Sequence, residues 1–303
     1  MNAEPLGDIV DRVRLVPDRH RVFDQDPSTA LRIFRIGAPV LSDLLDLGFP
    51  HRSSGDERYF DELDLANASL ALRLPSPRYL AMRRWPEAFR AVVGDRPVRY
   101  EVEVSADCGA EAPDHQCDFR LSAEVLALEA GLDPAARQFT VRSEVGAAGR
   151  TGEAPEELRQ LFAEVSAFHF HILPVALYGD LSFVAATSLA DCELASRYLV
   201  RRATEDGWEA RRSFGLLLSS PYSALHFWPE VRLDGAWHAF DPHIVNSLVR
   251  WGVLAPAEIS PAKVLDSAFF RITEDWVELV RDAGRPAPLS LLTRRRQVEG
   301  AAS

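Results

Sequence analysis

Residues 226–242 read HFWPEVRLDGAWHAFDP, and this stretch decides the fold of the second half of the chain. Asp234 and Gly235 separate two runs rich in aromatic and β-branched residues. Asp-Gly between such runs is the strongest short-range signal for a β-hairpin. A two-residue turn sets Leu233 opposite Ala236 and fixes every pair further out. The sequence therefore predicts an antiparallel hairpin of defined register.

The predicted register brings two titratable side chains to one face. Trp228 falls opposite Asp241, and His226 falls opposite His243. Because opposed residues share a face and side chains alternate, His226 and Asp241 are diagonal neighbours, roughly 7–8 Å apart at the backbone. A longer loop, or a bulge at Pro229, would move them to opposite faces. With the two-residue turn, the sequence predicts a base beside its orienting carboxylate.

Cys192 is the candidate nucleophile. Asp191 is a good N-cap for a helix that runs from Cys192 to about Thr204 and ends at Gly207. The first-turn N–H groups and the helix dipole favour a thiolate, and the same N–H groups can stabilise an oxyanion. Asp191 and Glu193 would raise the thiol pKa if they pointed at the sulfur. We expect them to face away, because successive helical positions diverge by about 100°.

The ordered pattern from Asp191 to Pro242 resembles the transglutaminase-like superfamily. The matching segments are Cys192, Gly207-Trp208-Glu209-Ala210-Arg211, His226-Phe227-Trp228-Pro229-Glu230-Val231, Gly235-Ala236-Trp237 and Asp241-Pro242. The resemblance implies a papain-like core, in which a helix-borne cysteine packs against an antiparallel sheet. It implies that Cys192 is the nucleophile, His226 the base and Asp241 the residue that orients the histidine. Two departures are Asp191, where a small residue is usual, and Pro229 within the histidine strand.

The resemblance also implies acyl transfer through a Cys192 thioester, with no cofactor. Relatives include protein cross-linkers, peptidases and amide-forming homologues of antibiotic and other natural-product pathways. An amine acceptor gives an amide, water gives protease or amidase activity, and an inert site would leave a binding module. Intracellular location, acidic composition and a large N-terminal extension favour amide formation. The expected partners are an acyl thioester, including one held on a carrier protein, and an amine, with hydrolysis as the alternative.

Three further residues are candidates for contact with substrate or triad. Trp228 and Trp237 flank the hairpin, and we expect them to form core or pocket wall and to exclude water. His243 is a weaker candidate because the register sets it opposite His226. His238 falls on the other face and is interpreted as structural.

The remaining cysteines and histidines give no convincing metal motif. Cys108, His115 and Cys117 lie in CGAEAPDHQC, which lacks the short Cys-x-x-Cys spacing and a clear fourth ligand. His169 and His171 alternate in FHFHIL. We expect an ordinary polar loop, a strand face, and no metal.

Patterns in the rest of the chain predict an α+β protein with three regions. Helices are expected at 77–85 and 86–94, and alternation predicts a strand at 98–104. The Gly-rich stretch 145–155 is interpreted as a linker. The predicted regions are an N-terminal α+β extension at 1–150, the catalytic core at 151–250, and a helical tail packed on the core at 251–303. Within that tail, Arg294–Arg296 is expected to be solvated.

Composition limits the classes of partner. The 303 residues are 47% hydrophobic and 26% charged, which is typical of a globular protein. A net charge of −11 argues against binding nucleic acid or an anionic membrane surface. The three cysteines are an odd number, and the N-terminal residues lack the charge and apolar run of a signal peptide. We therefore expect a soluble cytoplasmic protein.

Overall fold

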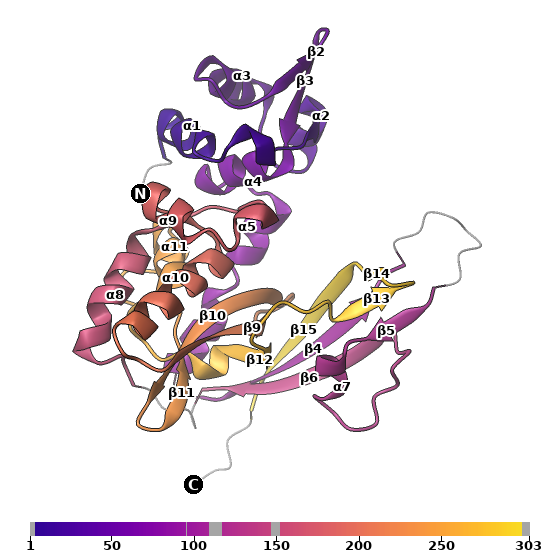
Figure 1. Ribbon diagram of the computed structural model, residues 1–303. Coiled ribbons are helices and arrows are strands. Elements are labelled where there is room, and N and C mark those ends of the chain that lie inside the picture. Colours follow the sequence, from indigo (N-terminus) through magenta and orange to yellow (C-terminus); the bar gives the residue numbers. More distant parts are fainter. Residues whose placement is uncertain (1–3, 95, 109–116, 147–151, 299–303) are drawn as a thin grey trace. The chain divides into compact units, whose positions relative to one another are not determined.

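The computed structural model describes residues 4–94, 96–108, 117–146 and 152–298 (Figure 1). The chain is mixed helix and sheet, as the α+β prediction stated. It divides into two compact units, each made of three stretches. Unit 1 comprises Met1–Arg84, Gln160–Leu199 and Pro242–Pro261, and unit 2 comprises Trp85–Arg159, Val200–Asp241 and Ala262–Ser303. The predicted boundaries near 150 and 250 do not separate these units, because the chain passes between them repeatedly.

Unit 1 is mostly helical. Its small sheets have the strand orders β1-β3-β2 and β7-β8. The helix α10 begins in this unit, and its last residues are counted in unit 2. The elements are α1 (Leu6–Arg14), η1 (Asp18–His20), β1 (Phe23–Gln25), α2 (Pro27–Arg32), α3 (Ala38–Asp46), β2 (Arg52–Ser54), β3 (Glu57–Asp61), α4 (Glu62–Ala71), α5 (Pro77–Met82), α8 (Glu156–Ala167), β7 (His169–Phe170), η2 (Val175–Leu177), α9 (Leu181–Thr187), β8 (Leu189–Ala190), α10 (Cys192–Glu205) and α11 (Pro242–Arg250).

Buried polar contacts join the distant stretches of unit 1. The Asn67 amide pairs with both backbone groups of Ile172, accepting from its N–H at 2.8 Å and donating to its carbonyl at 3.0 Å. Arg21 donates to the buried carboxylate of Asp64 at 2.7 Å. Burial nevertheless raises the pKa of Asp64 to about 7, against the opposing effect of Arg21. The N-terminal helices are thus built into the same core as residues 160–199.

The described residues of unit 2 form three antiparallel sheets. Their strand orders are β11-β10-β9-β12, β15-β4-β6 and β14-β13-β5. The elements are α6 (Pro86–Val93), β4 (Val98–Ala106), β5 (Phe119–Leu121), α7 (Ala123–Leu126), β6 (Gln138–Val145), β9 (Ala210–Leu217), β10 (Ala224–Leu233), β11 (Ala236–Ala239), η3 (Asp266–Ala268), β12 (Phe269–Thr273), β13 (Val280–Asp282), β14 (Arg285–Pro286) and β15 (Leu289–Gln297).

The β10–β11 hairpin has the predicted register. Leu233 faces Ala236, and the ladder continues outward to the pair Glu230–Ala239. Asp234 and Gly235 both adopt positive φ, 50° and 80°. This is the backbone of a two-residue hairpin turn and the reason for Asp-Gly at this position. The prediction of an antiparallel hairpin is therefore confirmed.

Pro229 does not bulge the β10 strand. It pairs directly with Arg212 of β9, and the register is unbroken from Ala224 to Val231. The Pro229 carbonyl still accepts a hydrogen bond from Phe240 N–H at 3.0 Å, just beyond the end of β11. Proline is tolerated here because the ladder needs only its carbonyl at that point.

The C-terminal region differs from the prediction. The expected helical tail at 251–303 is wrong, because 269–297 contributes strands β12 to β15. β15 pairs with β4 along its whole length, from Leu289–Ala106 to Gln297–Val98. Arg294–Arg296 is exposed, as expected, but lies within this strand instead of a loose tail. LSLLTRRRQ shows no alternation, so the pairing with β4 decides its conformation.

Candidate functional site

His226 and Asp241 form a buried hydrogen-bonded pair in unit 2. His226 lies on β10 opposite Gly215, and Asp241 follows β11 immediately before α11. His226 Nε2 lies 2.6 Å from Asp241 Oδ2, and the two residues are 2% and 4% exposed. An ionised Asp241 accepts the proton on Nε2, which leaves the lone pair of the imidazole on Nδ1. The arrangement is that of a base whose tautomer is fixed by a carboxylate.

Aromatic rings surround the His226 imidazole. Its centroid lies 5.8 Å from the Phe269 ring and 6.5 Å from the Trp228 ring, both nearly parallel to it. Trp85, half-buried at the start of α6, lies 6.0 Å away at a 57° angle. Burial among rings excludes water and strengthens the hydrogen bond to Asp241. Sequence reasoning missed Phe269 and Trp85, because both come from distant segments and neither belongs to a local motif.

Trp228 is a core residue. It is 1% exposed, and its ring stacks on Phe269 at 4.6 Å. Its indole N–H donates to Glu230 at 3.2 Å, and Glu230 is held by Arg211 at 2.7 Å from the paired position on β9. This network explains why arginine, tryptophan and glutamate occur together in the pattern: they fix the strand that presents His226.

Gly215 permits close packing beside the histidine strand. A Cβ atom at this position would lie 2.1 Å from the carbonyl oxygen of Phe270 on β12. Only glycine allows the backbones of β9 and β12 to approach so closely. Because Gly215 is the direct partner of His226, this approach brings the neighbouring Phe269 toward the imidazole.

Cys192 is the first residue of α10 in unit 1 and is partly exposed. Asp191 caps this helix, accepting from Leu194 N–H at 2.9 Å, and it also engages Glu193 N–H. Two of the first-turn donors expected for an oxyanion are therefore used by the cap.

The acidic neighbours of Cys192 have separate partners. Glu193 is bound by Arg197 one turn along the helix, at 2.7 Å. Asp191 is buried at the start of the helix. Burial, with a smaller contribution from the Glu193 charge, raises the pKa of Asp191 to about 7, although the N–H groups of the cap oppose the rise.

The buried Asp191 predicts a pH dependence of stability. Its pKa is near 3.9 in the unfolded chain and about 7 in the folded protein, so the folded state binds more protons between these values. Below about pH 4 the Asp191 carboxyl is protonated in both states, so it does not lower the free energy of unfolding. As the pH rises to about 7 the free energy of unfolding falls, and the loss from this group is about 4 kcal/mol at most. Asp191→Asn keeps the cap and should flatten this slope in urea unfolding.

Asp64 titrates in the same range and is present in both proteins, so the difference between wild type and variant isolates Asp191. Equal slopes in the two proteins would contradict the assignment.

His243 does not lie opposite His226, so this part of the register prediction is wrong. β11 ends at Ala239, and α11 begins at Pro242 and carries His243 in unit 1. There its Nε2 lies 3.0 Å from the carbonyl of Ala190, and its ring stacks on Phe170. A helix start replaces the strand because Pro242 is the first residue of α11, a position that proline favours.

Trp237 and His238 lie on β11, where they pair with Arg232 and Val231 of β10. Trp237 is half-buried, with the Arg211 guanidinium 4.2 Å above its ring. His238 is buried, and its Nδ1 lies 3.0 Å from Asp266 Oδ2. His238 therefore has the structural position that the sequence suggested.

The other candidate ligands divide into two groups. His169 and His171 line a cavity of about 360 Å³ in unit 1, together with Arg12, Arg73 and Arg250. Among the described residues they belong to no cluster of three metal-binding side chains. Cys108 and Cys117 do belong to one, with Asp282. His115 lies outside the described residues.

Comparison with known proteins adds no relative. No protein-family model matches the chain, and no curated protein matches it either. Within the described part of the chain, no helix is sufficiently long and apolar for a membrane crossing.

Proposed function

We propose that this protein is a transglutaminase-like, cysteine-dependent acyltransferase that joins an acyl thioester to an amine. The observation that carries this proposal is the buried 2.6 Å pair of His226 and Asp241. A histidine whose tautomer is fixed by a buried carboxylate is typical of a general base. Cys192 supports the nucleophile role because it opens a capped helix and is partly exposed.

The reaction proceeds in two balanced steps. His226 Nδ1 takes the proton of Cys192, and the thiolate attacks the donor carbonyl. The carbon–sulfur bond of the donor breaks, and its thiol leaves with the proton, which produces acyl-Cys192. A neutral amine then attacks this thioester, His226 takes its proton, and the amide leaves as Cys192 regains its hydrogen. Thioester exchange is nearly balanced energetically, so the first step needs no external energy source.

Carrier proteins are usually acidic, so docking of one would call for exposed basic side chains near Cys192. The arginines on or just after the Cys192 helix, however, each form an ion pair with an acidic side chain. These pairs are Arg197–Glu193, Arg201–Glu205, Arg202–Glu205, Arg211–Glu230 and Arg212–Asp275. We therefore propose that the acyl donor is a thioester. Small-molecule thioesters and thioesters held on a carrier protein are tested separately.

The test is intact-protein mass spectrometry with a panel of acyl thioesters, first without and then with a panel of amines. We expect a single acyl adduct on Cys192, which disappears with formation of an amide when the correct amine is added. Free acid as the sole product across the panel would replace the transferase with a hydrolase. Absence of any adduct on Cys192 would contradict acyl transfer through this residue.

A further inference from the structure

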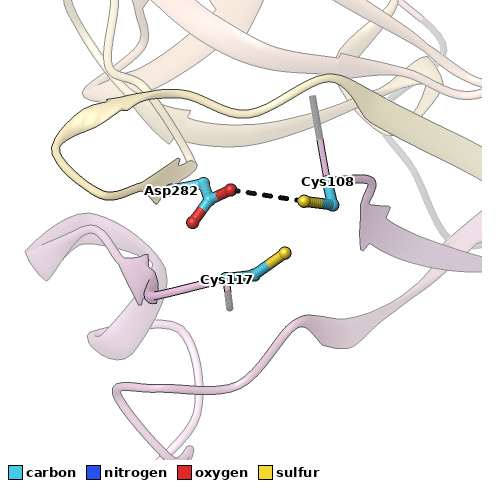
Figure 2. Close-up of side chains that lie close together, drawn as sticks. All are labelled: Cys108, Cys117 and Asp282. Atoms are coloured by element: carbon cyan, nitrogen blue, oxygen red, sulfur yellow. Dashed lines mark hydrogen bonds between the residues drawn. The ribbon is translucent and has the colours of Figure 1, made fainter. Parts of the chain in front are cut away.

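Cys108, Cys117 and Asp282 lie close together in unit 2 (Figure 2). One ligand atom from each, two thiol sulfurs and a carboxylate oxygen, lies within 4.8 Å of the other two. Cys108 Sγ is 3.9 Å from Asp282 Oδ2. The first two residues lie on either side of 109–116, whereas Asp282 follows 165 positions after Cys117 (282 − 117). Three potential ligands thus converge from separate parts of the chain.

Strand pairing positions each donor. Cys108 follows β4 closely, and the intervening Asp107 donates its backbone N–H to Pro288 at 2.8 Å. Cys117 precedes β5, which pairs with β13 so that Asp282 lies opposite Phe119. These contacts fix both backbone segments that carry the cysteines.

The Asp282 carboxylate is oriented by the backbone. Its Oδ1 accepts the N–H of Asp118 at 2.7 Å, and its Oδ2 is the oxygen near Cys108 Sγ. Hydrogen bonds of this kind from outside the ligand set orient carboxylates that bind metals. The neighbouring acids Asp107 and Asp118 are paired with Arg137 and Arg120, so their charges are compensated separately.

The donor set suits a soft or borderline divalent cation. Thiolates bind zinc and comparable metals, whereas magnesium and calcium prefer oxygen ligands alone. Zinc lies about 2.3 Å from sulfur and about 2.0–2.2 Å from a carboxylate oxygen, so tetrahedral ligands lie roughly 3.5–4 Å apart. The three ligand atoms, which lie within 4.8 Å of one another, need to move only slightly closer together to reach this spacing. Because Cys108 is exposed, water can supply a fourth ligand.

We propose that Cys108, Cys117 and Asp282 bind one zinc-class divalent cation. The ion joins the end of β4 to the start of β5 and to the β13–β14 hairpin. Binding releases the thiol protons and forms two metal–sulfur bonds and one metal–oxygen bond, with no change in oxidation state. This site is independent of the proposed acyl transfer, which uses none of the three residues.

The test uses the full chain, fully reduced and stripped of metal with a chelator, titrated with Co²⁺ and then with Zn²⁺. We expect one Co²⁺ per chain, with sulfur-to-metal charge-transfer absorption and the visible bands of a tetrahedral site. Zn²⁺ should displace it. Cys108→Ser, Cys117→Ser and Asp282→Asn should each weaken binding about tenfold or more. The matched controls Cys192→Ser and Asp118→Asn should bind as the wild type does.

A second readout is thermal unfolding, in which Zn²⁺ should raise the Tm of the wild type and of both controls. At the same Zn²⁺ concentration it should raise the Tm of Asp282→Asn less, although the side-chain oxygen of this variant can still accept the Asp118 N–H and so preserve the local fold. Metal uptake that is equal in ligand variants and controls would contradict the site. The site would also be contradicted if fully reduced protein, with three titratable thiols, took up no metal. A disulfide between Cys108 and Cys117 in unreduced protein would then be the remaining chemistry of this cluster.

Discussion

Cys192→Ala should lower the rate of the proposed acyl transfer by about 10⁴-fold or more, because the proposed covalent route depends on this thiol. Residual turnover would come only from binding and from any remaining oxyanion donors. The measurement is single-turnover formation of the acyl-enzyme and of the amide, followed by mass spectrometry. The fold should persist, since the change removes one partly exposed sulfur atom at the start of α10.

Cys117→Ala is the matched control, because Cys117 is also a partly exposed thiol but lies in the separate cluster with Asp282. It should retain wild-type transfer. Catalysis also requires Cys192 Sγ to come within reach of the His226 imidazole. Iodoacetamide should therefore label Cys192 more slowly in His226→Gln than in wild type at neutral pH. Full activity of Cys192→Ala would mean that Cys192 is not the nucleophile. An unchanged rate of labelling in His226→Gln would mean that His226 does not activate the Cys192 thiol.

Asp241→Asn should lower the acylation rate by about 10⁴-fold while leaving the fold intact, as the same change does in comparable triads. An amide at this position can donate to His226 Nε2, which moves the ring proton to Nδ1 and removes the lone pair that the base needs. The measurement is the pre-steady-state rate of acyl-Cys192 formation across a pH series. The loss should appear in this rate far more than in donor affinity.

Asp266→Asn is the control for this change, since Asp266 forms a similar contact with His238, at 3.0 Å, in the same unit. It should alter the free energy of unfolding but keep acylation within a few-fold of wild type. Burial raises the pKa of Asp266, against hydrogen bonds from Ala239 N–H and His238, so neutralising it is tolerated. Near-normal acylation by Asp241→Asn, or an equal loss in both variants, would mean that Asp241 does not orient the base.

Local signals in the sequence determined the hairpin and the helix that carries Cys192. Asp234 and Gly235 adopt the positive φ angles of a two-residue turn. This turn sets the register of the hairpin out to the pair Glu230–Ala239. Asp191 caps its helix within three residues. Each of these interactions acts over a few residues, so its free energy depends little on the rest of the chain. The contact between His226 and Asp241 was predictable for the same reason. The position of His243 was not, because β11 ends at Ala239 and α11 begins at Pro242, before the strand extends to His243.

Tertiary structure decided the rest. β15 has no alternating pattern, and its conformation depends on the free edge of β4, almost two hundred residues earlier in the chain (289 − 98 = 191). Phe269 and Trp85 meet at His226 only after β12 pairs with β9 beside Gly215. Asp282 reaches the two cysteines only through the pairing of β13 with β5. Such long-range pairings are stabilised by the whole sheet, and no short window of sequence contains both partners.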